Sequence, residues 1–180
     1  MYLPKNKGGI FVVLKYNLAD EKRKQLVGAI SKELGGMGAI DEVFDSLAIE
    51  MPLDGFTDEK LGNLKKMVAS KSSLIKKALG VDELPIIVTD DKVSFPWFRF
   101  DSDSTEVAAY THFISALCDM AKTQKRVNGK ETATDNEKFA FRTFLLRLGF
   151  IGPEFKEHRK VLLKNLSGSS AFRNGGSDNV

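Results

Sequence analysis

Apolar residues recur every three or four positions along five stretches of the chain, and we predict an amphipathic helix over each of them. The first three helices are expected over residues 20–34, 57–79 and about 104–126. The last two form a pair between 136 and 168, joined by a tight turn at Gly149 to Pro153. Pro153 suits the first turn of the second helix of the pair because its fixed φ is already helical, and Gly168 suits a left-handed residue just past that helix.

Alternating apolar and polar residues indicate strands between these helices. Residues 46–53 alternate in the way that is typical of a half-buried strand. Residues 85–95 contain two short β-prone runs around a polar turn, which predicts a hairpin. Pro96 then either interrupts the hydrogen bonding of the second strand or places that strand at a sheet edge.

These elements define an α+β fold, with a small antiparallel sheet packed with three helices and followed by a C-terminal helical hairpin. We place the α+β domain at residues 14–127, a polar linker at 128–134, the helical hairpin at 135–168 and a flexible tail at 169–180.

The first 13 residues allow two interpretations. Residues 9–16 are rich in strand-forming side chains and could form an extra strand. Alternatively, residues 7–9 could be encoded by a purine-rich, ribosome-binding-like sequence, so that translation starts at Val12, Val13 or Leu14. The intact mass of the native protein distinguishes the two.

The cysteine content and the length of the apolar runs indicate the cellular compartment of the protein. Cys118 is the single cysteine, so no internal disulfide can form, and a reducing cytoplasm is the natural compartment. No apolar run approaches the length of a membrane span.

The net charge is +3. Residues 1–134 are neutral overall, so the whole excess of positive charge lies in the C-terminal helical pair and its tail.

The sequence contains no recognisable catalytic constellation, and we expect neither enzymatic activity nor a cofactor or metal. His112 and His158 lie on different predicted helices and are interpreted as surface or helix-flank residues. Cys118 lies in an apolar helical pattern without an activating neighbour and is interpreted as a packed thiol.

Several segments resemble the small "virulence-related" proteins of clostridial and related Firmicutes genomes, which often lie near mobile elements. The resemblance spans roughly residues 15–173. It is carried by MPLDGF (51–56), VASKSSLIKKALG (68–80), VSFPWF (93–98), AYTHFISALCDMAK (109–122) and the text from Asn136 to Phe172. It implies a genomic neighbourhood but no particular activity. Members of that family carry a longer G-x-P-x-x-A-Y segment where this chain has only residues 35–44, which puts any site on that segment in doubt.

Two functional hypotheses follow, and the sequence does not assign the oligomeric state. The chain is a protein-interaction or regulatory module, or it is a nucleic-acid-binding accessory protein whose basic C-terminal helix contacts phosphates. The first hypothesis uses the aromatic residues Trp97, Phe98, Phe141 and Phe144. The second uses Lys156, Arg159, Lys160 and Lys164, which share one helix face, together with Arg142 and Arg147 on the preceding helix.

Overall fold

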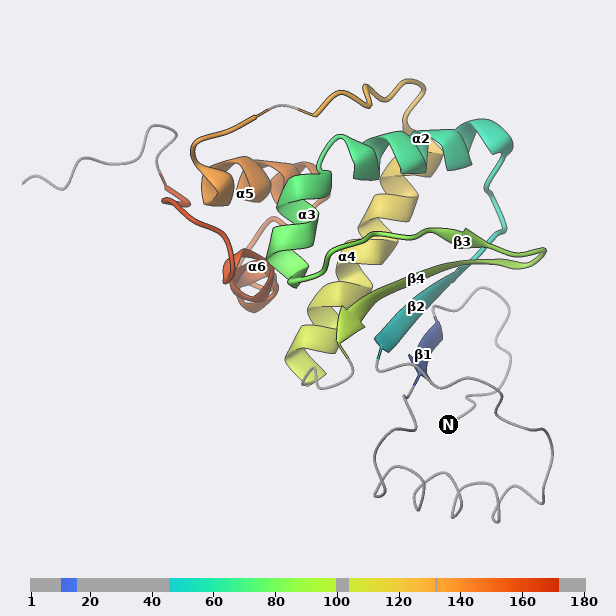
Figure 1. The fold of residues 1–180 in the computed structure, drawn as a ribbon, viewed down its shortest axis with the longest axis horizontal. Helices are drawn as coiled ribbons and strands as arrows, with labels where there is room; N and C mark the ends of the chain where they lie inside the picture. The colour runs from blue at the N-terminus through green and yellow to red at the C-terminus, as the bar shows by residue number, and fades with distance from the viewer. Residues whose placement is uncertain (1–10, 16–45, 100–103, 132, 172–180) are drawn as a thin grey trace, which may run out of the picture.

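The computed structural model describes residues 11–15, 46–99, 104–131 and 133–171, and the helix expected over residues 20–34 lies outside these ranges. The described residues form an α+β fold, as predicted, with a four-stranded antiparallel sheet and five helices (Figure 1). In chain order the elements are β1 (Phe11–Lys15), β2 (Ser46–Pro52), α2 (Asp58–Ala69), α3 (Ser72–Leu79), β3 (Ile87–Val88), β4 (Lys92–Arg99), α4 (Ser104–Thr123), α5 (Glu137–Arg147) and α6 (Lys156–Leu163).

The strands follow the order β1-β2-β4-β3, so β2 and β4 are central. The predicted hairpin is present as β3 and β4, and Thr89 donates its backbone N–H to Lys92 O across the turn at 2.9 Å. Pro96 lies where the β2–β4 register shifts: Ile49 pairs with Phe95 and Leu47 with Phe98. Two residues of β4 therefore face one residue of β2, and this bulge accommodates the missing N–H of Pro96, as one of the two sequence alternatives proposed.

Strand β2 is more deeply buried than its alternating pattern predicts. The side chains of Ala48, Ile49, Glu50 and Met51 are all buried, so both faces of this part of the strand are covered. Glu50 is accommodated because Lys92 Nζ, on the neighbouring strand, lies 2.8 Å from its carboxylate. The half-buried strand was thus a wrong prediction for residues 48–51, since the pattern did not reveal this cross-strand ion pair.

The single long helix predicted over residues 57–79 is in fact two helices. Thr57 caps α2 as expected, with its side-chain oxygen accepting from the Lys60 N–H. The first helix ends at Ser70, whose hydroxyl donates to Met67 O at 2.8 Å. This side-chain bond competes with continued helix formation, and α3 restarts at Ser72 without a side-chain cap of its own. Gly80 closes α3 at φ +70, as the sequence indicated.

The two C-terminal helices are joined by a turn that includes Gly149 to Pro153, but the roles predicted for Pro153 and Gly168 need correction. Pro153 precedes α6 by three residues and offers its carbonyl to the Lys156 N–H at 3.0 Å, so it lies in the turn and not in the helix. Gly168 is left-handed, at φ +92, but it lies five residues beyond the end of α6. Its conformation was predicted correctly, whereas its role as a helix terminus was not.

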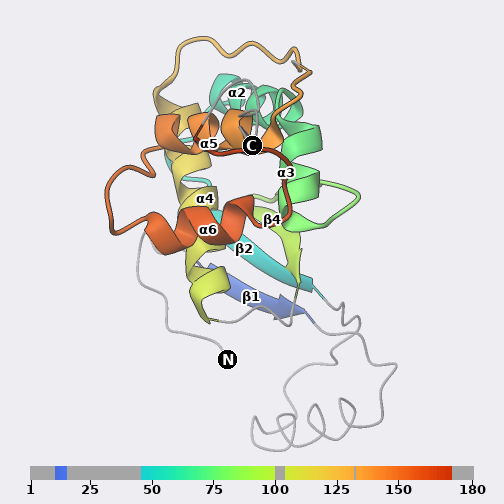
Figure 2. The same cartoon turned by 90° about the vertical axis from the view of Figure 1, so that its left-hand side faces the viewer.

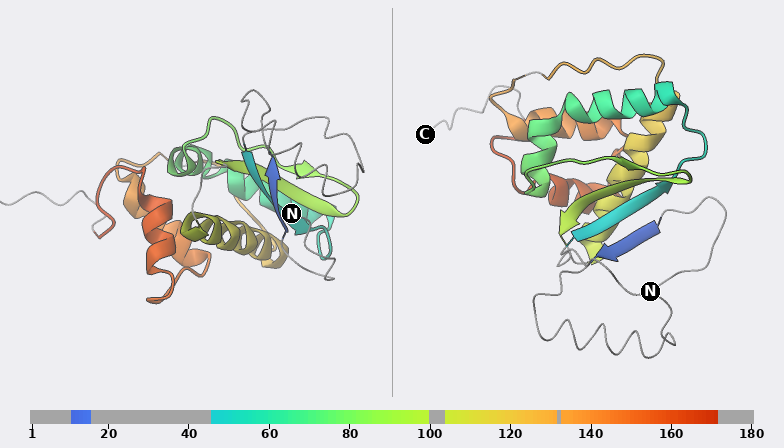
Figure 3. Two further views of the ribbon diagram at one scale, coloured as in Figure 1. Left: turned by 90° about the horizontal axis from the view of Figure 1, so that it is seen from below. Right: turned by 45° about the vertical axis from the view of Figure 1, so that its right-hand side comes forward.

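One hydrophobic core joins the residues on both sides of the segment predicted to be a linker. Phe98 of β4 stacks on Tyr110 of α4, with ring centroids 4.6 Å apart, which packs the sheet against α4 (Figure 3). Phe113, one turn further along α4, contacts Phe141 of α5, with ring centroids 6.0 Å apart. The body and the helical pair are therefore separated along the chain but share one core.

Residues 124–131, which we name the strap, run along α2 instead of hanging free (Figure 1). Asn63 Nδ2 donates to Gln124 O at 2.9 Å, and the Glu131 carboxylate accepts from the Ser73 N–H at 2.9 Å. The strap therefore passes over the break between α2 and α3, and its chain runs in the same direction as that of the two helices. Within the described residues, none of the helices combines the length and the apolar character that a membrane span requires.

Candidate functional site: a groove beside α4

A groove of about 430 Å³ lies between α4 and the turn that joins α5 to α6. Figure 2 shows α4 passing behind α5 and α6 at this end of the molecule. One wall is a single face of α4, on which side chains repeat at helical spacing, and the other wall is the turn. The lining residues are His112, Ser115, Ala116, Asp119, Met120, Thr123, Gln124, Arg147, Leu148, Gly149, Phe150 and Phe155.

The groove combines apolar surface with isolated charges of opposite sign. Met120 and Phe155 are partly buried and contribute apolar surface, while Phe150 is fully buried and packs against Phe155. Asp119 on α4 and Arg147 at the end of α5 are both exposed, and no ion pair is formed by either within the described residues. Six of the twelve lining residues are polar or charged, so the groove offers both apolar area for affinity and polar groups that can orient a ligand.

His112 and His158 lie together at one end of the groove, which the sequence interpretation of separate surface histidines did not anticipate. Their ring centroids are 4.9 Å apart, and Phe155 packs edge-on against both rings. The Nδ1 atom of His158 is buried without a hydrogen-bond partner. Burial lowers the pKa of His158, and the neighbouring His112 lowers it further, since either effect disfavours the charged ring.

The described residues contain no cluster of three or more His, Cys, Asp or Glu side chains suited to a metal ion. Cys118, on α4, is fully buried, and burial raises the pKa of its thiol to about 12. The thiolate that nucleophilic chemistry needs is therefore disfavoured. The prediction of a packed thiol is confirmed.

The α6 cations expected to contact nucleic acid do not form one free basic face. Arg159 donates Nη1 to Phe150 O at 2.8 Å and to Gly152 O at 3.0 Å, so it holds the α5–α6 turn. Lys164 forms an ion pair with Glu106 of α4. Lys160 lies 3.7 Å from Glu157, while Lys156 is exposed. Of the two cations on α5, Arg142 is half-buried and Arg147 lines the groove. Helical spacing grouped four of these cations but could not show that Arg159 and Lys164 are engaged by other parts of the chain.

The aromatic residues considered for partner contact belong to the core. Trp97 and Phe98 of β4, and Phe141 and Phe144 of α5, are all buried. Trp97 also donates its indole N–H to Pro85 O at 2.7 Å, which fixes the approach to β3. These side chains pack the body against the helical pair and are not presented to a partner.

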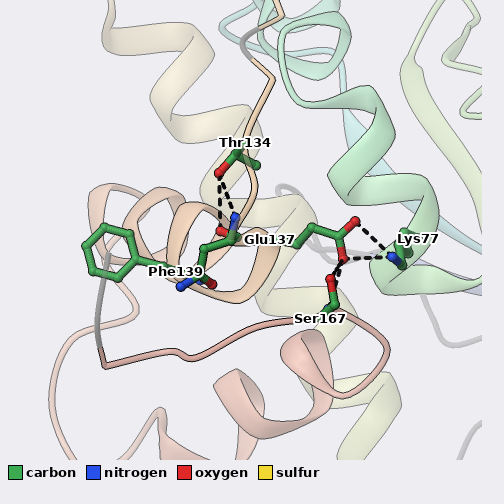
Figure 4. Close-up of polar contacts among 6 residues, drawn as sticks. Lys77, Thr134, Glu137, Phe139 and Ser167 are labelled. Carbon is green, nitrogen blue, oxygen red and sulfur yellow. Dashed lines mark hydrogen bonds and ion pairs between the residues drawn. The ribbon is translucent and has the colours of Figure 1, made fainter. Parts of the chain in front are cut away.

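A polar junction at the start of α5, at the other end of this helix from the groove residue Arg147, ties three segments together (Figure 4). Glu137, at the start of α5, accepts from Lys77 Nζ of α3 at 2.8 Å and from the Ser167 hydroxyl at 2.6 Å. These bonds, with the Ser167 N–H, lower the pKa of Glu137 to about 2. The neighbouring Asn136 caps α5 by accepting from the Phe139 N–H at 3.1 Å. Glu137 thus anchors the chain that follows α6.

Comparison of the chain with protein-family models, with curated proteins and with solved structures found no match in any of the three. The resemblance to the virulence-related family therefore remains a prediction.

Proposed function

We propose that the protein is a non-enzymatic interaction module that binds a short segment of a protein partner in the groove beside α4. In line with the resemblance and with its single buried cysteine, it would act in the bacterial cytoplasm as a regulatory accessory of a mobile element. The observation that supports this proposal is the composition of the groove: apolar surface flanked by an unpaired acid and an unpaired base.

The shape of the groove favours an extended occupant. Its α4 wall runs from His112 to Thr123, which corresponds to about 16 Å of helix length. A strand-like peptide rises by about 3.3 Å per residue, so roughly five residues would cover this wall. Asp119 and Arg147 would then select a segment that carries charges of both signs around apolar side chains.

A peptide-display selection on the full-length protein tests the proposal. The selected peptides should bind the wild-type chain and should lose at least tenfold in affinity for Arg147→Glu and for Asp119→Lys, because each change reverses a charge in the groove. Both positions are exposed, so neither change should disturb folding. Lys156→Glu is the matched control, because this exposed lysine is not among the groove residues.

Peptides that bind all three variants equally would show that the groove is not the binding surface. Failure to enrich any peptide would contradict the proposal itself.

A further inference from the structure

The strap places additional cations beside the lysines of α2 and α3. Residues 58–79 contain six lysines and two acidic residues, and both acids lie in the first turn of α2. The strap adds Lys125, Arg126 and Lys130 against a single acid, Glu131. The lysines of residues 58–79 and the cations of the strap are about fifty positions apart in the sequence, and only the fold brings them together.

Three contacts fix the strap against the helices. Gln124 O accepts from Asn63, and a Cβ added at Gly129 would lie 3.5 Å from the Lys66 side chain. Further along, Glu131 accepts both the Ser73 N–H at 2.9 Å and the Ser73 hydroxyl at 2.7 Å. Glu131 is thus bound to the first turn of α3, while the strap cations remain available to bind another molecule.

Most cations of this region are accessible, and seven of them form no ion pair in the part of the chain that the structure describes. Lys65, Lys66, Lys125, Arg126 and Lys130 are exposed, and Lys71 and Lys76 are half-buried. Within the described residues, none of these seven side chains forms a hydrogen bond or an ion pair. This distinguishes them from Arg159 and Lys164 on α6, both of which are engaged by other parts of the chain.

We propose that this surface, formed by α2, α3 and the strap, binds the phosphate backbone of duplex nucleic acid. Helix α2 is about 18 Å long, and a duplex presents about ten phosphates over that length. The cations of this surface that contact such a polyanion would release condensed counterions, which is the main source of affinity in sequence-independent binding.

The same surface argues for a duplex over a single strand. Residues 58–79 and 124–131 contain no Phe, Tyr or Trp, and proteins that bind single strands stack the bases on aromatic side chains. The surface offers charge without stacking, so we expect contacts to phosphates that carry no sequence information.

Binding of the full-length chain to a fluorescent 20-base-pair duplex tests the proposal. With about four phosphate contacts, raising the salt from about 50 to about 200 mM should weaken binding roughly a hundredfold. The triple variant Lys65→Gln, Lys66→Gln and Lys130→Gln should lower affinity by at least about tenfold and reduce the salt slope by about three. The matched control is Arg142→Gln, Lys156→Gln and Lys160→Gln, which removes the same charge from α5 and α6 and should change affinity by less than about twofold.

Three results would overturn the proposal: no binding at low salt, an equal loss in both triple variants, or binding to phosphatidylserine vesicles but not to the duplex. An equal loss would mean that net charge alone drives the interaction. Arg147→Glu changes a residue of the groove and should leave the effect of the Lys65, Lys66 and Lys130 substitutions on duplex binding unchanged. The outcome of the duplex test is therefore independent of the peptide-binding proposal.

Discussion

Lys77 and Glu137 are sixty positions apart in the chain, yet their side chains meet at 2.8 Å and join α3 to the start of α5. The second oxygen of Glu137 accepts from Ser167, so one carboxylate holds three segments. We expect Glu137→Gln to lower the free energy of unfolding by about 1 kcal/mol at pH 7, because charge-assisted hydrogen bonds to Ser167 and Lys77 are lost. Urea denaturation measures this change.

The same carboxylate should make stability sensitive to acid. Its pKa is about 2 in the folded chain, below the ordinary value of 4.5, so its contribution is present above about pH 4.5 and is lost as the pH falls towards 2. Glu137→Gln should flatten this part of the pH profile. Glu157→Gln is the control, since Glu157 is exposed and forms only a 3.7 Å pair within its own helix. A profile that is identical in wild type and Glu137→Gln would contradict the role assigned to the junction.

Glu131 provides the second test of a long-range contact, because it caps a helix that has no cap of its own. The N-cap position of α3 is Lys71, which makes no side-chain bond to the helix, and Glu131 supplies the acceptor from the strap. Glu131→Ala should therefore lower stability by about 1 kcal/mol, as the loss of a helix cap usually does. It should also speed hydrogen exchange of the strap amides. Lys130→Ala should do neither, because Lys130 is exposed and its side chain has no partner among the described residues.

The contrast between Thr57 and Glu131 shows which helix caps can be predicted from the sequence and which cannot. Thr57 precedes the helix that it caps, so the local pattern identified both the cap and the helix start. Glu131 caps a helix 58 positions earlier, and no local pattern carries that information. The helices, the hairpin and the α+β class follow from periodicity within each segment. The strap and the α6 ion pair depend on tertiary contacts between distant residues, whereas the helix break at Ser70 rests on a local side-chain bond that hydrophobic periodicity does not reveal.

The candidate groove, too, could be predicted from the sequence only where its residues lie close together in the chain. His112 and Asp119 share one face of α4 at helical spacing, and that spacing could have been read from the chain. The opposite wall comes from the α5–α6 turn, and the approach of His158 to His112 depends on the packing of α6 against α4. The sequence therefore supplied half of the site, and the fold supplied the rest.

The two histidines should make the molecule less stable in mild acid. The pKa of His158 is lowered in the folded chain by burial and by His112, so the unfolded chain binds a proton more readily. The stabilising contribution is therefore complete above the ordinary value near 6.5 and is lost as the pH falls below it. His158→Gln should remove this dependence, and His112→Gln should reduce it by removing the neighbouring positive charge. Thermal unfolding between pH 7.5 and 5 measures the effect, and an unchanged profile in His158→Gln would rule out this origin.

Gly168 and Gly62 allow one chemical change to be tested in two opposite environments. Gly168 has φ +92, and a Cβ there would lie 2.4 Å from Asn136 Oδ1, the oxygen that caps α5. Gly168→Ala should therefore lower the free energy of unfolding by about 2 kcal/mol, through backbone strain and displacement of the cap. Gly62 lies inside α2, and a Cβ added there meets nothing within 4 Å. Gly62→Ala should raise stability by up to about 1 kcal/mol, because alanine favours a helix interior. Equal effects of the two substitutions in urea denaturation would show that the chain after α6 does not pack on Asn136.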